Sequence, residues 1–320
     1  MGAIMRSMID MDTVQIEITN YCTQSCSNCS RFCPHVKQPF YMEMEQFKQA
    51  VDSMVGYPKM TGIQGGEPLL HPQFPEICEY LRSKIPYEQL GLWTTLPKGF
   101  EKYREILCKT FKHIFINDHT RDDIYHHPAL VAIREVVTDE CQMWNKIDHC
   151  WAQMSWSASI NPRGTWFCEI AASMAMLFGV DGLGWPIEKN WWCKIPKDFT
   201  KQMEAFCPIC GFAAPIHRRK SIEPIDDISP NNLELFKDHF RNIERFKVHS
   251  LQTTDRQEML AAYKDTDYRN RIAARYNMFV MVNDQNFWTP YLKTTESVVP
   301  EKRRRVQDVY MERIKCEVDI

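Results

Sequence analysis

Thr13-Val-Gln-Ile-Glu-Ile-Thr-Asn-Tyr-Cys22-Thr-Gln-Ser-Cys26-Ser-Asn-Cys29 is the stretch on which the fold assignment depends. Residues 13–18 alternate apolar and polar side chains with a period of two, which predicts a strand. Three cysteines follow at CxxxCxxC spacing, so they lie on the loop that leaves this strand. Three thiolates on one short loop can ligate three irons of a [4Fe–4S] cluster and leave the fourth iron open to a small molecule. A zinc knuckle is the alternative, because Cys33 would give zinc its fourth ligand.

The pattern continues outward from this stretch as strands that alternate with helices. Strands are expected at 60–64, 90–95 and 113–117, and helices at 43–55, 73–84 and 100–111. Helices of this length between strands predict right-handed βαβ units and a parallel sheet. We therefore expect an α/β fold, with a partial (β/α)6 barrel of the TIM type over residues 10–150. The cysteine loop would lie at the carboxyl ends of the strands, where such folds build their active sites.

The second half of the chain has a different character. A helix is expected from Pro128 to Val137, and residues 156–168 predict a hairpin with its turn at 161–164. Residues 168–212 are rich in tryptophan and cysteine and predict a small module with little regular structure. We place this module at 151–228 and a helical extension of unknown role at 229–320, with helices at 231–246 and 300–315.

Composition narrows the class of protein. The chain has 320 residues, of which 44% are hydrophobic and 25% charged, and a net charge of −2, so no nucleic-acid or membrane partner is expected. Its start lacks the apolar core of a secretory signal, which favours the cytoplasm. Thirteen cysteines are many for such a chain. Because several are closely spaced, they indicate metal or redox chemistry rather than disulfides.

A second motif, Gly65-Gly66-Glu67-Pro68, ends the second expected strand. Two glycines permit a strand end to approach a ligand closely, and an acidic residue suits an ammonium group. CxxxCxxC after the first strand, followed by this motif, resembles the radical S-adenosylmethionine (radical SAM) superfamily. The resemblance implies a SAM-binding [4Fe–4S] cluster on the three cysteines, with the amino group of SAM received by Gly65–Pro68. One departure is Asn28, since the family usually has an aromatic residue before the third cysteine.

Polar residues at later strand ends are candidates for further contacts with SAM. Thr94, Thr95 and Asn117 occupy such positions, and the ribose or the carboxylate of SAM are the groups that they would reach. The alternative is equally open, because polar residues are common where strands end.

The cysteines of the second half form another candidate metal site. Cys168, Cys193, Cys207 and Cys210 resemble the twitch form of the SPASM extension, which implies an auxiliary [4Fe–4S] cluster held by four thiolates. Dehydrogenases of the 2-deoxy-scyllo-inosamine type carry such a module. The gap between Cys168 and Cys193 is longer than usual for it, which makes Cys193 the least secure ligand. A zinc ribbon on the same thiols is the alternative.

The resemblance also implies an activity. Reductive cleavage of SAM would give a 5′-deoxyadenosyl radical that abstracts hydrogen from substrate, and an auxiliary cluster would make the outcome a net oxidation. Because the stretch before Thr13 is short, we expect no leader-peptide domain, and we expect a sugar, an aminocyclitol or a nucleotide-linked compound as substrate. Flavodoxin or ferredoxin would serve as the reductant. Peptide modification, redox-neutral epimerisation and a zinc-binding scaffold stay open.

A few further residues are candidates for catalysis. His217, beside Arg218 and Arg219, could accept a proton, although the same residues would suit a solvated loop. Cys141 and Cys150 could donate a hydrogen atom. The cysteines within expected helices, Cys78 and Cys108, are expected to be small buried hydrophobes.

Overall fold

We analysed a computed structural model of the chain, which describes residues 5–117, 119, 124–155, 157–249 and 280–282. Its described strands build one main sheet in the order β11-β4-β3-β2-β1-β6-β7 and two small two-stranded sheets, β9 with β10 and β5 with β8. The strands of the main sheet are β1 (Thr13–Thr19), β2 (Met60–Gly65), β3 (Leu90–Thr94), β4 (His113–Ile116), β6 (Ser157–Asn161), β7 (Gly164–Trp166) and β11 (Val280–Val282). The small sheets pair β9 (Asp226–Ile228) with β10 (Phe246–Val248), and β5 (Tyr125–His126) with β8 (Arg219–Lys220).

The centre of the main sheet is parallel. β1 pairs in parallel with both β2 and β6, and β3 continues the parallel order to β4. The two edge strands, β7 and β11, are antiparallel to their neighbours. A parallel centre of this kind must be covered by helices on both faces, because its strands are buried on both sides.

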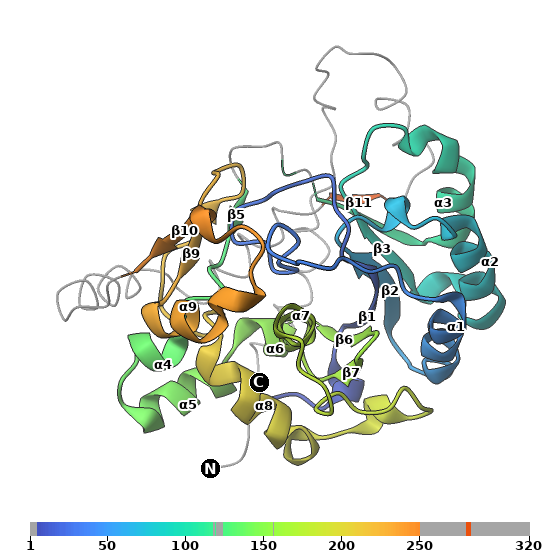
Figure 1. The fold of residues 1–320 in the computed structure, drawn as a ribbon. Helices are drawn as coiled ribbons and strands as arrows, with labels where there is room; N and C mark the ends of the chain where they lie inside the picture. The colour runs from blue at the N-terminus through green and yellow to red at the C-terminus, as the bar shows by residue number, and fades with distance from the viewer. Residues whose placement is uncertain (1–4, 118, 120–123, 156, 250–279, 283–320) are drawn as a thin grey trace.

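The helices divide between the two faces of the sheet (Figure 1). Three of them follow the first strands in turn and lie together on one face: α1 (Met44–Ser53), α2 (Phe74–Lys84) and α3 (Arg104–Thr110). The other face carries α7 (Glu169–Phe178), which contacts β6 and β7. The remaining helices are α4 (Ile133–Val136), α5 (Glu140–Asp148), α6 (Trp151–Ser155), α8 (Thr200–Phe206) and α9 (Pro230–Phe236).

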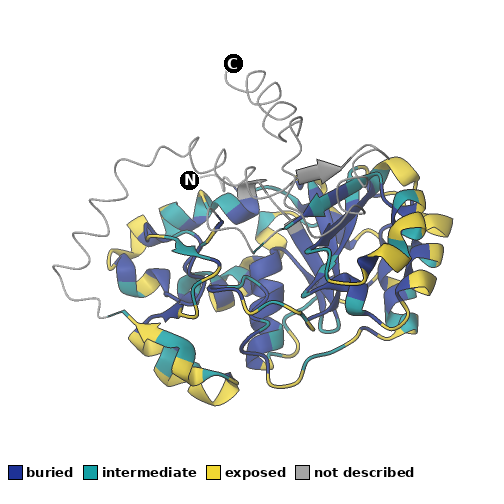
Figure 2. Cartoon of the chain, turned by 90° about the horizontal axis from the view of Figure 1, so that it is seen from above, coloured by how far each residue is buried: buried dark blue, intermediate teal, exposed yellow. Residues whose placement is uncertain are grey.

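The side chains of β1 give it one apolar face and one polar face. All seven of its residues are buried. Because side chains alternate along a strand, Val14, Ile16 and Ile18 share one face and join the hydrophobic core, while Gln15 and Glu17 share the other. Burial is deepest along these central strands and α7, and the outer faces of α1–α3 are exposed (Figure 2).

The predicted α/β fold with a central parallel sheet is confirmed, and the four strands expected in the first half form within one or two residues of their predicted bounds. Closure into a partial (β/α)6 barrel and the three domain boundaries stay predictions. β6 and β7, which we assigned to the second unit, are strands of the main sheet.

Several expectations about the second half were wrong. Residues 168–212 contain regular helices, α7 and α8, because the apolar run 170–178 is buried all round rather than on one stripe. The helix expected to run to Val137 is the single turn α4, and the helix expected over 231–246 ends at Phe236. The helix expected at 300–315 lies outside the described residues.

None of the helices in the described part of the chain combines the length and the hydropathy that a membrane span requires.

Candidate active site

The cysteine loop leaves the carboxyl end of β1, as the sequence predicts. Asn28 and Phe32 have left-handed backbone angles, with φ of 48° and 54°, and these turn the chain back on itself between Cys26 and Cys33. Asparagine tolerates this conformation better than most residues because its short side chain can hydrogen-bond locally. The loop therefore folds into a compact coil beside the sheet.

Four thiols, not three, meet in this coil. The Cys33 thiol donates hydrogen bonds to Cys22 and Cys29, which lowers the pKa of Cys29 to about 7 and raises that of Cys33. Burial, and then the neighbouring Cys29 and Cys22, raise the pKa of Cys26. Like charges oppose one another here, so three thiolates at this spot require a bound cation or cluster to balance them.

The Gly65–Glu67 segment is attached to the stem of this loop. The Gly66 amide donates to the Thr19 carbonyl at 2.8 Å, and the Glu67 amide donates to the Tyr21 carbonyl at 2.7 Å. A β-carbon on Gly65 would lie 2.0 Å from the Thr19 oxygen, and one on Gly66 would lie 2.2 Å from the Tyr21 oxygen. The glycines are thus required for close approach to the loop backbone, whereas we had expected close approach to a ligand.

Glu67 holds the ends of two strands together. Its carboxylate accepts hydrogen bonds from the Thr94 hydroxyl, the Thr95 amide and the Thr95 hydroxyl at 2.7 Å each, and from the Leu69 amide at 3.1 Å. Burial raises the pKa of Glu67, and the bonds from Thr95 oppose that shift. Four donors use about all the acceptor sites of a carboxylate. In this arrangement Glu67 and the two threonines bind one another, so direct contact with SAM stays a prediction.

Unpartnered polar atoms lie farther along the same edge of the sheet. The Asn117 amide donates to the Thr94 carbonyl at 2.9 Å, whereas its side-chain Oδ1 is buried with no hydrogen-bond partner among the described residues. Nδ1 of His119 is also buried with no hydrogen-bond partner among the described residues. Buried polar atoms without partners cost free energy, so this edge is suited to a polar ligand.

The second group of thiols surrounds a cavity of about 30 Å³. Cys150, Cys168, Cys207 and Cys210 line it, and its other walls are apolar apart from Gln153. Burial raises the pKa of Cys168 to about 12 and lifts the pKa values of Cys207 and Cys210 well above their usual range. Since the lining contains no cation, thiolates are stable here only if they are bound to metal.

Cys150, and not Cys193, is the fourth thiol of this group. Cys193 is exposed at the end of a short 3₁₀ helix and does not line the cavity. Cys150 follows α5 and influences the pKa of each of the other three thiols. Spacing along the chain could not show this, since Cys150 precedes the hairpin and belongs to no recognisable motif.

A buried ion pair links the two groups of thiols. Arg31, two residues beyond Cys29, lies 2.7 Å from the carboxylate of Glu169, the residue after Cys168. The Arg31 guanidinium also donates to Gln64 at 2.7 Å and to Ser173 at 3.0 Å. Arg31 therefore joins the end of the cysteine loop to the start of α7 across the polar face of β1.

The catalytic candidates from the sequence are less well placed. His217 and Cys141 are exposed. No sequence motif pointed to His126, whose Nδ1 lies 2.7 Å from the Ser27 carbonyl in the cysteine loop. A carbonyl only accepts hydrogen bonds, so Nδ1 carries the proton and Nε2 is left as an acceptor. Burial lowers the pKa of His126, which favours the neutral ring.

The tryptophans before Cys193 pack this part of the chain against α1. Trp191 and Trp192 are buried, and the Trp192 indole donates to the Ser53 carbonyl of α1 at 3.1 Å. Cys78 is buried, as expected, and Cys108 is half-buried.

Within the described residues, no group of three or more His, Cys, Asp or Glu side chains is arranged to hold a single metal ion. A [4Fe–4S] cluster binds one thiolate at each iron, so its ligands stand farther apart than those of one ion. The donor sets at both places, thiols with apolar or hydrogen-bonded surroundings, fit the ligand chemistry of such a cluster.

Comparison with known proteins gives distant likenesses. No protein-family model and no curated protein matches the chain. Among the solved structures that resemble the chain at this low level are two of BtrN. BtrN in complex with AdoMet and 2-DOIA has 15% identity and a TM-score of 0.36, over 50% of this chain and 74% of that one. Selenomethionine BtrN in an open conformation has 12% identity and a TM-score of 0.36, over 63% of this chain and 87% of that one.

Proposed function

We propose that the chain is a radical SAM oxidoreductase that acts on a small hydroxylated molecule. The observation that carries the proposal is the presence of two separate thiol groups, one at the carboxyl edge of a parallel sheet and one around a buried apolar cavity. A protein that only needed zinc for stability would not require a Gly-Gly-Glu segment bonded to the first loop.

In this proposal Cys22, Cys26 and Cys29 hold the SAM-binding cluster, and Cys33 supports them through its hydrogen bonds. Cys150 joins Cys168, Cys207 and Cys210 as the ligands of the auxiliary cluster, in place of Cys193. When bound, the first cluster would supply the electron that cleaves SAM to a 5′-deoxyadenosyl radical, and the auxiliary cluster would accept one electron. Flavodoxin or ferredoxin is the reductant that we propose.

The proposed reaction is the oxidation of a secondary alcohol to a ketone in a sugar, an aminocyclitol or a nucleotide-linked compound. The substrate loses one hydrogen atom, one electron and the hydroxyl proton. A protein base must take that proton. We assign this role to His126 in preference to the exposed His217, because His126 contacts the cysteine loop and its burial favours the neutral imidazole.

Anaerobic reconstitution tests the proposal. We expect about eight irons and eight sulfides per chain, four from each cluster, and 5′-deoxyadenosine from SAM with dithionite. Cys26→Ala is expected to abolish 5′-deoxyadenosine formation, whereas Cys78→Ala, at a buried cysteine outside both groups, leaves it intact. Bound zinc without sulfide would contradict the proposal.

The auxiliary ligands are tested by a matched pair. Cys150→Ser is expected to halve the iron content to about four per chain and to spare SAM cleavage. Cys193→Ser is the control and is expected to keep both clusters, since Cys193 is exposed and away from the cavity. Iron loss in Cys193→Ser but not in Cys150→Ser would show that Cys193 is the fourth ligand.

A further inference from the structure

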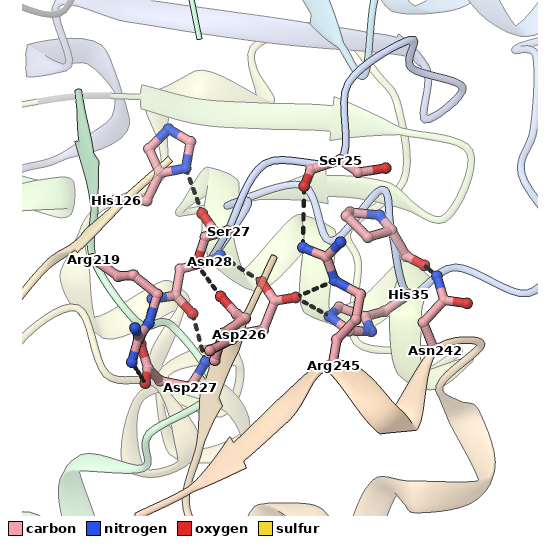
Figure 3. Close-up of polar contacts among 12 residues, drawn as sticks. Ser25, Ser27, Asn28, His35, His126, Arg219, Asp226, Asp227, Asn242 and Arg245 are labelled. Atoms are coloured by element: carbon pink, nitrogen blue, oxygen red, sulfur yellow. Dashed lines mark hydrogen bonds and ion pairs between the residues drawn. The ribbon is translucent and has the colours of Figure 1, made fainter. Parts of the chain in front are cut away.

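The cysteine loop rests on a pair of carboxylates from a distant part of the chain. β9 supplies Asp226 and Asp227, which are 2% and 4% exposed. Both meet Asn28, almost two hundred residues earlier in the sequence, in the middle of the loop between Cys26 and Cys29 (Figure 3).

Asn28 is bound on three of its polar groups. Its backbone amide donates to the Asp226 carboxylate. Its side-chain Nδ2 donates to Asp227 Oδ2 at 2.8 Å, and its Oδ1 accepts from the Asp227 amide at 2.8 Å. A side-chain amide is the group that can donate to the carboxylate and accept from the backbone at the same time. This accounts for an asparagine where the family usually has an aromatic residue.

The carboxylates are themselves fixed by arginine and histidine side chains. Arg219 donates twice to Asp227, at 2.6 and 2.8 Å, and His249 lies 2.7 Å from the same carboxylate. Arg245 donates to Asp226 at 2.7 Å and also to the Ser25 carbonyl of the loop at 3.0 Å.

These partners favour the ionised form of both carboxylates. Burial opposes ionisation of Asp227, but Arg219 and His249 outweigh it and hold its pKa well below the usual range. For Asp226 burial also opposes ionisation, and His35 and Arg245 outweigh it. In its ionised form each carboxylate only accepts hydrogen bonds, which suits an amide donor and disfavours another carboxylate at position 28.

Neighbouring main-chain contacts extend the attachment. The Ser27 amide donates to the Ser221 carbonyl at 2.8 Å, and the Ser27 hydroxyl donates to the Ile225 carbonyl. With the Gly65–Glu67 segment at its stem and Arg31 beyond its third cysteine, the loop is held at three places. The middle attachment is the one nearest to Cys26 and Cys29.

We propose that Asp226 and Asp227 are positioning residues that recognise Asn28 and hold Cys26 and Cys29 close enough to share one cluster. The inference rests on the proposed function. Thiolates repel one another, so a loop without this attachment would spread before the irons bind. Supporting contacts around metal ligands are typically worth about 10–100-fold in metal affinity.

Asn28→Asp tests the proposal directly, because it places a carboxylate against that of Asp227, which the Asn28 side chain now contacts. We expect a loss of about tenfold or more in occupancy of the cluster whose electron paramagnetic resonance (EPR) signal changes when SAM is added. The SAM-insensitive signal of the auxiliary cluster is expected to persist, which shows that the chain is folded. Asn190→Asp is the control, since Asn190 is exposed and has a similar left-handed φ of 64°.

The reciprocal variant Asn28→Asp/Asp227→Asn gives a second readout. It exchanges amide and carboxylate across the same contact, so it is expected to restore at least half of the SAM-responsive EPR signal. A structural effect unrelated to this pairing would make the double variant worse than the single one. The inference fails if Asn28→Asp keeps the wild-type SAM-responsive EPR signal. If wild-type protein itself has no SAM-responsive signal, the proposed function fails instead.

Discussion

Glu17 places its carboxyl group in a buried position on the polar face of β1. It is 1% exposed, and its Oε2 has no hydrogen-bond partner among the described residues. Burial raises its pKa from 4.5 to about 7, although Arg31 opposes the shift. Glu17 is therefore protonated in the folded protein over a range of pH in which the unfolded chain has released the proton.

A substitution measures the energetic effect of that shift. Because the pKa of Glu17 is raised on folding, its contribution to stability is fully present below pH 4.5 and is lost as pH rises through about 7. Glu17→Gln removes the ionisation, so we expect the variant to gain up to about 3 kcal/mol relative to wild type between pH 5 and pH 8. Urea unfolding across this range measures the difference. A difference that does not change with pH would contradict the shift.

Some site residues were predictable one at a time and others were not. Cys22, Cys26 and Cys29 share a local motif, so a short window of sequence identified them as ligand candidates. Cys150 was assigned a different role, because only the packing of α5 beside α7 and α8 brings it to the cavity. Asp226 and Asp227 gave no signal, since acidic residues are common on surfaces and their partner lies far away in sequence.

The carboxyl ends of β1 and β2 and the start of the cysteine loop form one hydrogen-bonded unit. Gly66 allows β2 to reach the Tyr21 carbonyl, and the hydrogen bonds there fix the direction in which the cysteine loop leaves the sheet. Strand pairing is thus continued into the loop rather than ending at Thr19.

Gly66→Ala is expected to displace this stem. Its β-carbon would lie 2.2 Å from the Tyr21 oxygen, so backbone must move, at a cost of about 1–3 kcal/mol. We also expect the SAM-responsive cluster to be lost, as followed by EPR. Gly179→Ala is the control. It places alanine at a left-handed φ of 67° in open space, so it costs about 1 kcal/mol and leaves the cluster in place. Equal cluster retention in both variants would rule out a role for the stem.

At this scale the strands were easier to predict than the helices of the second half. β1 to β4 have short apolar or alternating runs that end at turn residues, which is a local signal. α7 is apolar on every side because it is buried on every side, and so it has no helical periodicity to detect. The small β9–β10 sheet pairs in parallel over a long connection, and no local pattern encodes that.

At the scale of the whole molecule, the Arg31–Glu169 ion pair joins the chain beside one thiol group to the chain beside the other. Both side chains are buried, at 3% and 7% exposure. A buried pair of this kind adds little net stability, but removal of one partner leaves a charge without compensation. We therefore expect removal of Arg31 to affect the chain beside both thiol groups.

Arg31→Met is expected to destabilise the protein by about 3–5 kcal/mol, because Glu169 loses its buried cation. Iron is expected to be lost from both sites. Arg31→Met/Glu169→Met should cost less than the single variant, since no buried charge of the pair remains. Arg163→Met is the control, because its partner Asp181 is exposed, and we expect less than about 1 kcal/mol. Urea unfolding and iron analysis give both quantities. An additive double variant would argue against the pairing.

The contact between Asn28 and β9 also has a consequence for the order of events during synthesis. The two partners are 198 and 199 residues apart, so most of the described chain must leave the ribosome before the contact can form. His249 and Arg245, which fix the carboxylates, emerge later still. The cysteines that are translated first are thus among the last to reach their final arrangement, which places maturation of the first thiol group after translation of the strand that supports it.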